Sequence, residues 1–469
     1  MIQNNHTKDS NSSAFTIVEL LVVIVVIGIL AAITVVSYTG ISGRAVVVTL
    51  QSDLDNSSRQ LKLYYAMYGS YPTVMVGNCP TMPTVDNSYC LKNSSNNSYT
   101  IYNSSGTGFS LTEANTNGTT YVITEKTGPV AVVPHTGVLA ALATPTIASG
   151  PNSYGIAISA DGTSVYNTNR NTSVISMYSR NTSTGALTAL ATPTIATGTT
   201  PDEVNVSADG TSVYVTNMNA NSISMYSRNT STGALTALAT PTIATGTNPY
   251  DIAISADGTS VYTTNQNSGN IYMYNRNAST GALTALATPT IATGTNPYDI
   301  AISADGTSVY AASFDLNTIS MYSRNTSTGA LTALATPTIA AGTGSCGVVI
   351  SADGNSVYVT NRVGNSISMY SRNTSTGILT ALATPTIATG TNPQNIAISL
   401  DGTSVYATNL NADTISMYNR NVSTGVLTAA ATPTIATGAN PQDITISPDG
   451  NSVYVANILG NNISMYNRN

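Results

Sequence analysis

The sequence is short of charge and of large aromatic side chains. Only 8% of its 469 residues are charged, Trp is absent, and Phe occurs three times. Because Ser, Thr, Asn, Gly and Ala dominate instead, the surface must be built mainly from hydroxyls and amides. The formal net charge is -6, and the few Lys and Arg residues form no basic stripe of the kind that nucleic-acid binding requires. We therefore exclude nucleic acid as a partner.

Cysteine and histidine are also scarce. Cys79 and Cys90 lie eleven positions apart, whereas Cys346 is far from both, which predicts one local disulfide and one unpaired thiol. A disulfide indicates a location outside the cytosol. No His occurs from Thr136 onward, so this part of the chain lacks the commonest general base of hydrolytic enzymes.

One long apolar run stands near the N-terminus. Residues Phe15–Ile33 read FTIVELLVVIVVIGILAAI, with Glu19 as their one charged side chain. The charge-free stretch Leu20–Gly43 would form a helix of about 36 Å, longer than the roughly 30 Å core of a bilayer. We expect this segment to span a membrane. An ionisable group in hydrocarbon is costly, so Glu19 by default has a function and a partner.

The segment Ala14-Phe15-Thr16-Ile17-Val18-Glu19-Leu20-Leu21 resembles the processing site of type IV prepilins. The resemblance implies that residues 1–14 are a leader and that a prepilin peptidase cuts between Ala14 and Phe15 and methylates the new amine. It also implies that Glu19 pairs with the amine of Phe15 on a neighbouring pilin subunit. The alternative is an ordinary membrane anchor in which Glu19 is incidental.

The resemblance extends beyond the membrane segment. Residues 15–68 would form one long helix, membrane-spanning and then amphipathic, and Leu61–Pro72 is similar to the end of the pilin helix. Residues 69–127 would form a small α+β head. In it, Cys79 and Cys90 close a loop, and the segments YTIYNS, GFSLTEA and TTYVITE alternate as three strands. Residues 128–135, rich in Pro and Val, are expected to be a linker.

The rest of the chain is a repeat. The dipeptide Asp-Gly recurs every 48 residues from Asp161 to Asp449, giving seven units of four short strands each. This period predicts an all-β seven-bladed propeller over residues 136–469. The seventh unit lacks its fourth strand, and an orphan fourth strand at residues 136–144 precedes the first unit, so we expect it to close the ring.

Two tetrapeptides in the second strands, Tyr214–Asn217 and Tyr358–Asn361, read YVTN. The repeat region thus resembles the YVTN repeat family, whose lactonase-like relatives form seven-bladed propellers.

The seven units differ from one another mainly at the start of the first strand and in the loop after the second strand. Both positions lie at the same edge of a blade, so the variation is expected to fall on one face, where carboxylates and aromatic rings could bind a glycan, or carboxylates alone Ca²⁺. The alternative is drift through relaxed packing at a channel mouth. Seven constant Arg residues are expected to be structural, pairing with backbone or carboxylate within each blade. The predicted ligand-binding residues are Tyr154, Asp202, Glu203, Tyr250, Asp251, Tyr298, Asp299, Phe314, Gln394, Asn395, Gln442 and Asp443.

The sequence favours a type IV pilin-like surface protein. It would be made in the inner or cytoplasmic membrane, join other pilin subunits through its N-terminal helix, and hold the propeller outside the cell to bind a glycan or protein in adhesion. A bulky head would crowd a fibre shaft, which favours a minor or tip pilin. The alternatives are a pseudopilin of a secretion system and a lactonase-like enzyme on a membrane anchor. Near-identical blades supply no base and nucleophile pair, so we assign no catalytic residue, cofactor or metal, and we expect Cys346 to be incidental.

Overall fold

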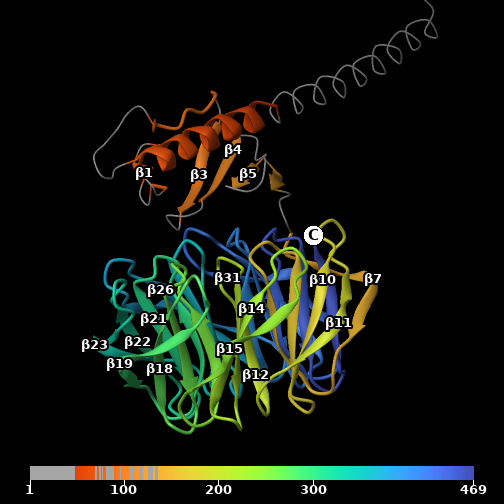
Figure 1. Cartoon of the computed structure of the whole chain (residues 1–469). Helices are drawn as coiled ribbons and strands as arrows, with labels where there is room; N and C mark the ends of the chain where they lie inside the picture. Colours follow the sequence, from red (N-terminus) through yellow and green to blue (C-terminus); the bar gives the residue numbers. More distant parts are fainter. Residues whose placement is uncertain are drawn as a thin grey trace, which may run out of the picture. The chain divides into compact units, whose positions relative to one another are not determined.

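The computed structural model describes residues 48–68, 71–72, 75–76, 78–80, 89–95, 97–104, 109–115, 120–124, 130–132 and 136–469. They form two compact units that divide between Pro134 and His135 (Figure 1). The predicted processing site at Ala14 and Phe15, Glu19 and the apolar run lie outside the described residues. Within those residues, no helix is both long enough and apolar enough to cross a membrane.

The N-terminal unit, which we call the head, contains a helix over residues 48–68 and a four-stranded antiparallel sheet. Leu50, Leu54 and Leu61 lie on one face of the helix and pack against Phe109 and Leu111 of the sheet, as the spacing of apolar residues on an amphipathic helix requires. The sheet has the order β3 (Asn97–Ser104), β4 (Phe109–Asn115), β5 (Thr120–Thr124) and β6 (Val130–Val132), and a short ribbon joins β1 (Met75–Val76) to β2 (Cys79–Pro80).

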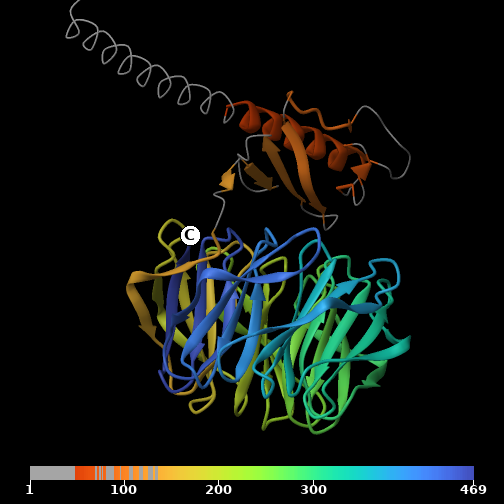
Figure 2. The ribbon, with the colours of Figure 1, turned by 180° about the vertical axis from the view of Figure 1, so that it is seen from behind.

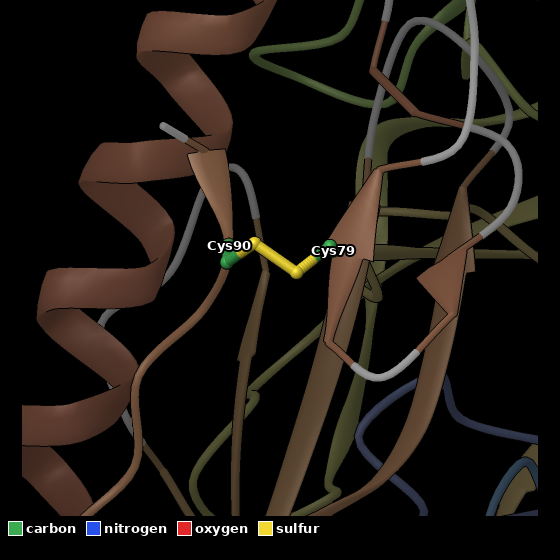
Figure 3. Close-up of a disulfide and its surroundings, with 2 residues drawn as sticks. All are labelled: Cys79 and Cys90. Carbon is green, nitrogen blue, oxygen red and sulfur yellow. A yellow bond between two sulfur atoms is a disulfide. The ribbon is translucent and has the colours of Figure 1, made fainter. Parts of the chain in front are cut away.

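Two features of the head bear on the sequence analysis. The predicted disulfide between Cys79 and Cys90 is confirmed (Figure 3). The sheet has four strands where three were expected, because β6 falls inside the stretch interpreted as a linker. Val130 and Val132 of β6 pair with Val122 and Thr120 of β5. The added strand covers the edge of β5, whose backbone groups would otherwise lie unpaired.

The second unit is a seven-bladed propeller, as predicted (Figures 1 and 2). Each blade is a four-stranded antiparallel sheet, and the first strands of neighbouring blades contact each other around the central axis. Blades 1 to 4 comprise β8 (Ser153–Ile158), β9 (Ser164–Asn169), β10 (Val174–Arg180) and β11 (Leu187–Ala196); β12 (Pro201–Val206), β13 (Ser212–Asn217), β14 (Ser222–Arg228) and β15 (Leu235–Ala244); β16 (Pro249–Ile254), β17 (Ser260–Asn265), β18 (Asn270–Arg276) and β19 (Leu283–Ala292); and β20 (Pro297–Ile302), β21 (Ser308–Ser313), β22 (Thr318–Arg324) and β23 (Leu331–Ala340).

Blades 5 to 7 repeat this arrangement. They comprise β24 (Ser345–Ile350), β25 (Ser356–Asn361), β26 (Ser366–Arg372) and β27 (Leu379–Ala388); β28 (Pro393–Ile398), β29 (Ser404–Asn409), β30 (Thr414–Arg420) and β31 (Leu427–Ala436); and β32 (Pro441–Ile446), β33 (Ser452–Asn457), β34 (Asn462–Arg468) and β7 (Leu139–Ala148). Strand β7 precedes the first blade in the sequence and pairs with β34 at the end of the chain, with Leu139 opposite Arg468. The ring is closed by this pairing.

The hydrophobic cores lie between blades rather than within them. Between blades 3 and 4, for example, Tyr262, Ile271 and Met273 of one blade pack against Val309 and Tyr322 of the next. The second strand of every blade is buried along its whole length. Each blade therefore buries its apolar side chains only against its neighbours, which is why the ring must close to be stable.

The propeller has two distinct ends. We call the end with the Asp-Gly turns and the turns after the third strands the turn face. The opposite end, which holds the starts of the first strands and the loops after the second strands, is the loop face. The chain enters the propeller at the turn face, where the Gly137 amide donates to the Asn469 carbonyl, 3.1 Å away.

The Asp-Gly turns differ in detail from the hairpin that the dipeptide indicates. Gly162 has a φ of +68°, but Asp161 is not in the left-handed region. Instead, the Asp161 carboxylate accepts from the Thr163 amide at 3.0 Å and from the Ser159 hydroxyl at 2.5 Å. The side chain of Asp161 thus holds a four-residue loop, so the Gly alone needs a positive φ.

Candidate functional site

A ring of seven ion pairs lies at the turn face and links every blade to its neighbour. Each constant Arg reaches back to the Asp of the preceding blade, with Nη2 to Oδ2 distances of 2.7 to 3.0 Å. The pairs are Arg180–Asp449, Arg228–Asp161, Arg276–Asp209, Arg324–Asp257, Arg372–Asp305, Arg420–Asp353 and Arg468–Asp401. The structural role expected for these Arg residues is thus supported, but their carboxylate partners lie between blades and not within one blade.

The third ion pair shows how each guanidinium is satisfied. Arg276 donates from Nη1 to the Gly258 carbonyl at 3.1 Å and from Nε to the Tyr214 hydroxyl at 2.9 Å. Burial alone would raise the pKa of Asp209, but bonds from Ser207, Thr211 and Arg276 outweigh it and lower that pKa to about 2. Because the guanidinium of Arg276 is buried, removing either member of the ion pair would leave an uncompensated charge inside the protein.

Eleven of the twelve residues predicted to bind a ligand lie in the starts of the first strands, gathered around the propeller axis, and Phe314 lies in the loop after β21. Most are buried there: Tyr154, Asp202, Tyr250, Asp251, Gln394, Gln442 and Asp443 are at most 9% exposed. Glu203, Tyr298, Asp299, Phe314 and Asn395 are half-buried. The variable positions of the first strands thus meet, but their side chains fill the channel rather than line an open face.

Tyr250 is the centre of this packing. Its hydroxyl accepts from the Nε2 atoms of Gln394 and Gln442, at 3.1 and 3.0 Å, and lies 2.9 Å from the Tyr154 hydroxyl. Its ring lies 4.6 Å from that of Tyr298. Five blades, that of Tyr250 included, thus meet at one side chain.

The axial carboxylates bind backbone amides of neighbouring blades. Asp299 accepts from the Ile300 amide of its own strand at 2.7 Å and from the Val348 amide of the next blade at 2.8 Å. Asp251 bridges blades 3 and 4 in the same way, and Asp443 bridges blade 7 to blade 1. These carboxylate oxygens, which we predicted to bind a ligand, instead link the first strands of neighbouring blades.

The axis is also crowded with acids. Burial, and then the neighbouring Asp443 and Asp251, raise the pKa of Glu203 well above its usual value. Burial and the adjacent Asp251 do the same for Asp299, and burial raises the pKa of Asp443 to about 6. Like charges in a low dielectric cannot all ionise, so these carboxyl groups share protons at neutral pH.

Arg170, which the sequence did not indicate as a site residue, contacts two members of this cluster. Its Nε donates to Asp202 at 2.6 Å, and its guanidinium carbon lies 3.2 Å from the centre of the Tyr154 ring. The available signal was its position in the variable loop after the second strand. Burial raises the pKa of Asp202 to about 6 despite this pairing.

Little space remains on the axis. A cavity of about 20 Å³ remains, bordered by Glu203, Asp299, Cys346 and Gln394 among others, and it would hold about one water molecule. In the part of the chain that the structure describes, no three His, Cys, Asp or Glu side chains gather where they could hold a metal ion.

The rim of the loop face carries apolar side chains. Leu316, Val363 and Leu459, from the loops after the second strands of blades 4, 5 and 7, are 52%, 58% and 67% exposed. Phe314, in the loop after β21, stacks on Tyr298, with ring centres 5.0 Å apart. Both rings are half-buried.

Comparison with known families fits this geometry. The family described as "Lactonase, 7-bladed beta-propeller" matches residues 96–245, 238–293 and 332–435, which is more than half of the chain. The chain belongs to this family. A second match, to the "Prokaryotic N-terminal methylation motif", covers residues 9–35 and supports the resemblance to prepilins.

Solved structures share the fold of this lactonase-family propeller. A protein from Bacteroides fragilis with the provisional name 6-phosphogluconolactonase is 22% identical, with a TM-score of 0.54, covering 69% of this chain and 92% of that one. A periplasmic gluconolactonase from Pseudomonas aeruginosa is 16% identical (0.53; 75% and 95%), and the Kuenenia stuttgartiensis hydrazine synthase is 18% identical (0.53; 68% and 96%). A search of curated proteins found no match. At this level of identity, the likeness concerns the fold alone.

Proposed function

We propose that this protein is a type IV pilin-like surface protein, a minor or tip pilin, whose lactonase-family propeller binds an extracellular ligand at its loop face. The observation that carries the proposal is the relation between the two faces. The chain enters at the turn face, beside Asn469, whereas the loops that differ between blades lie at the opposite end. The loop face thus lies at the end of the propeller opposite to Thr136, where the propeller begins.

The composition of the loop face supports recognition of an uncharged or apolar surface. The axial carboxylates are engaged by backbone amides, so the loop face offers the half-buried Phe314, the exposed Leu316, Val363 and Leu459, and exposed amide side chains such as Asn171 and Asn219. An aromatic ring beside aliphatic side chains suits the apolar face of a sugar or an apolar patch on a protein. Adhesion through such contacts is the function we favour.

Two experiments test the proposal. Electron microscopy of sheared surface fibres, labelled with antibody to the propeller, should show label on the fibres. Retention of all label in the cell envelope would favour a pseudopilin instead.

Ligand binding is tested with glycan and host-protein arrays. The triple variant F314A/L316S/V363S should lose any binding that the wild type shows. The matched control I378A/L400S/V422S removes exposed apolar residues of the turn face and should keep it. Equal binding by the two triple variants would refute the placement of the site.

A lactonase is the second candidate, favoured by family membership. The packed axis argues against it, since pockets for small molecules usually span about 300 to 1,000 Å³. Hydrolysis of any member of a lactone panel, lost in R170M and in F314A, would establish an enzyme in place of an adhesin.

A further inference from the structure

One cation of the propeller lacks an acidic partner. Residues 136–469 contain no Lys, so the cationic side chains of the propeller are all Arg residues. Seven of them form the ion pairs of the turn face, and Arg170 pairs with Asp202 near the axis. The remaining one, Arg362, lies in the loop after β25 and forms no ion pair with any residue that the structure describes. It is therefore available to an anionic ligand at the loop face.

Neutral groups hold Arg362 in place. Its backbone amide donates to the Gly344 carbonyl at 2.8 Å, and its Nε atom donates to Oδ1 of Asn392 at 2.7 Å. Asn392 directly precedes β28, so the side chain reaches from blade 5 to blade 6. Its two Nη atoms remain accessible, and no described residue accepts a hydrogen bond from them. Because Nε is engaged, these two atoms form a planar fork, which is the geometry that binds a carboxylate through two parallel hydrogen bonds.

An aromatic surface adjoins the same loop at Gly344. The other six blades have Asn or Thr at this position. A Cβ atom on Gly344 would lie 2.8 Å from Cγ2 of Val363 and 3.2 Å from Cε2 of Phe314, so only glycine allows the two side chains to come this close. Phe314 also stacks on Tyr298. Burial raises the pKa of Tyr298, and the charge of the nearby Arg362 opposes that shift.

We propose that this patch, formed by Tyr298, Phe314, Arg362 and Val363, binds an acidic glycan. The carboxylate of a sugar acid accepts from both Nη atoms of Arg362, while the apolar face of a sugar ring packs on Phe314 and Val363. Arg362 thus adds one positive charge to a face whose other accessible groups are mostly uncharged. The inference rests on the proposed binding at the loop face and names the class of its ligand.

One acid on the same face acts against this charge. Asp315 follows Phe314 in the loop of blade 4 and is exposed, and its carboxylate accepts only a long hydrogen bond, of 3.4 Å, from Asn296 Nδ2. An anionic ligand that packs on Phe314 is attracted by Arg362 and repelled by Asp315. Removal of these two charges should therefore change the affinity in opposite directions.

Paired ligands test the role of the carboxylate. The full chain in detergent is applied to an array of oligosaccharides that carry uronic or sialic acids, each printed beside its methyl ester. We expect the protein to bind an acidic glycan and to bind its ester at least tenfold more weakly, because the ester offers Arg362 no anionic oxygen. Binding to none of the acidic glycans, or equal binding of acid and ester, would overturn the proposal.

Variants then locate the charge, with affinities measured by titration calorimetry. R362Q should weaken binding of the acid about tenfold and leave binding of the ester unchanged, whereas F314A should weaken both. D315N should tighten binding of the acid about twofold. R59Q, which changes an exposed arginine of the head helix, is the matched control and should bind as the wild type does. An acid affinity that is the same in R362Q and R59Q would contradict the assignment.

A measurement on the unaltered protein covers the case in which R362Q fails to fold. Raising NaCl from about 0.05 to 0.5 M should weaken binding of the acid but not of the ester, since salt screens exposed charges. An acid affinity that does not depend on salt would overturn the role of Arg362.

Failure of this proposal is distinguishable from failure of the proposed function. A neutral ligand that is lost in F314A/L316S/V363S but kept in R362Q would overturn the acidic glycan and leave the loop-face site in place. Binding of an acidic glycan by a chain that never labels surface fibres would support the ligand class and contradict the assignment as a pilin.

Discussion

The two ends of the propeller differ in how their buried charged groups are compensated. At the turn face, seven guanidiniums meet seven carboxylates, and every blade contributes the same two residues. On the axis near the loop face, carboxyl groups meet one another, and the residue at a given position differs between blades. The ion pairs of the turn face persist at any pH at which their carboxylates are ionised. The axial cluster, in contrast, is stable only while some of its carboxyl groups are protonated.

This difference explains which positions of the 48-residue repeat are constant in all seven units and which differ between them. A bond from one blade to the next must recur identically around a closed ring, so Arg276 and Asp209 have six counterparts. Around the axis the blades meet in one place, where Tyr250 of blade 3 contacts four different neighbours: Tyr154, Tyr298, Gln394 and Gln442. Variation there is a packing solution as well as an opportunity for binding.

Breaking one ion pair of the turn face should have the largest effect. R276M leaves Asp209 without its guanidinium and the Tyr214 hydroxyl without a donor, and we expect a loss of about 3 kcal/mol in unfolding free energy. Denaturant titration of the full chain measures it. R59M, which changes an exposed arginine of the head helix, serves as the control. A comparable loss in both variants would mean that the ion pairs of the turn face contribute no more to stability than an exposed arginine does.

Removing one axial acid should increase the free energy of unfolding at high pH rather than decrease it. The folded pKa of Glu203 lies above its unfolded value, so wild-type stability falls as pH rises from the unfolded pKa to the folded one. E203Q removes this dependence and should be more stable than the wild type by about 1 to 2 kcal/mol at pH 9, with little difference at pH 4. D315N, an exposed acid, should show no such trend. Equal pH profiles for wild type and E203Q would mean that the acids at the axis do not interact.

The neutral network on the axis should matter less than the charges. Y250F removes the hydroxyl that accepts from Gln394 and Gln442, leaving two buried amides without it, and should cost about 1 kcal/mol. Thermal unfolding of Y250F is compared with that of Y65F on the exposed helix surface. Identical midpoints would indicate that water replaces the hydroxyl.

The smallest expected signal is chemical. Cys346 is 1% exposed, and burial raises the pKa of its thiol to about 11, so it should resist a thiol reagent at pH 8 until the propeller unfolds. Labelling is followed by mass spectrometry in the presence and absence of denaturant. Rapid labelling of the native protein would show that the axis is open to solvent, contrary to its packing.

The sequence alone was sufficient for the propeller. A period of 48 residues with four alternating segments predicts blades, because each segment carries its own strand pattern and its own turn residues. It also predicted the disulfide, since two Cys residues close together have few other uses outside the cytosol. It did not predict β6, because three residues next to a Pro carry too little pattern to distinguish a strand from a linker.

For the candidate site, the sequence determined which residues vary and that they lie at one end of the blades. Only the tertiary structure decided that Asp251, Asp299 and Asp443 bind amides of the next blade. Local patterns depend on neighbours along the chain and can be read from the sequence. The burial and partners of a carboxylate depend on residues dozens to hundreds of positions away, which only folding brings into contact.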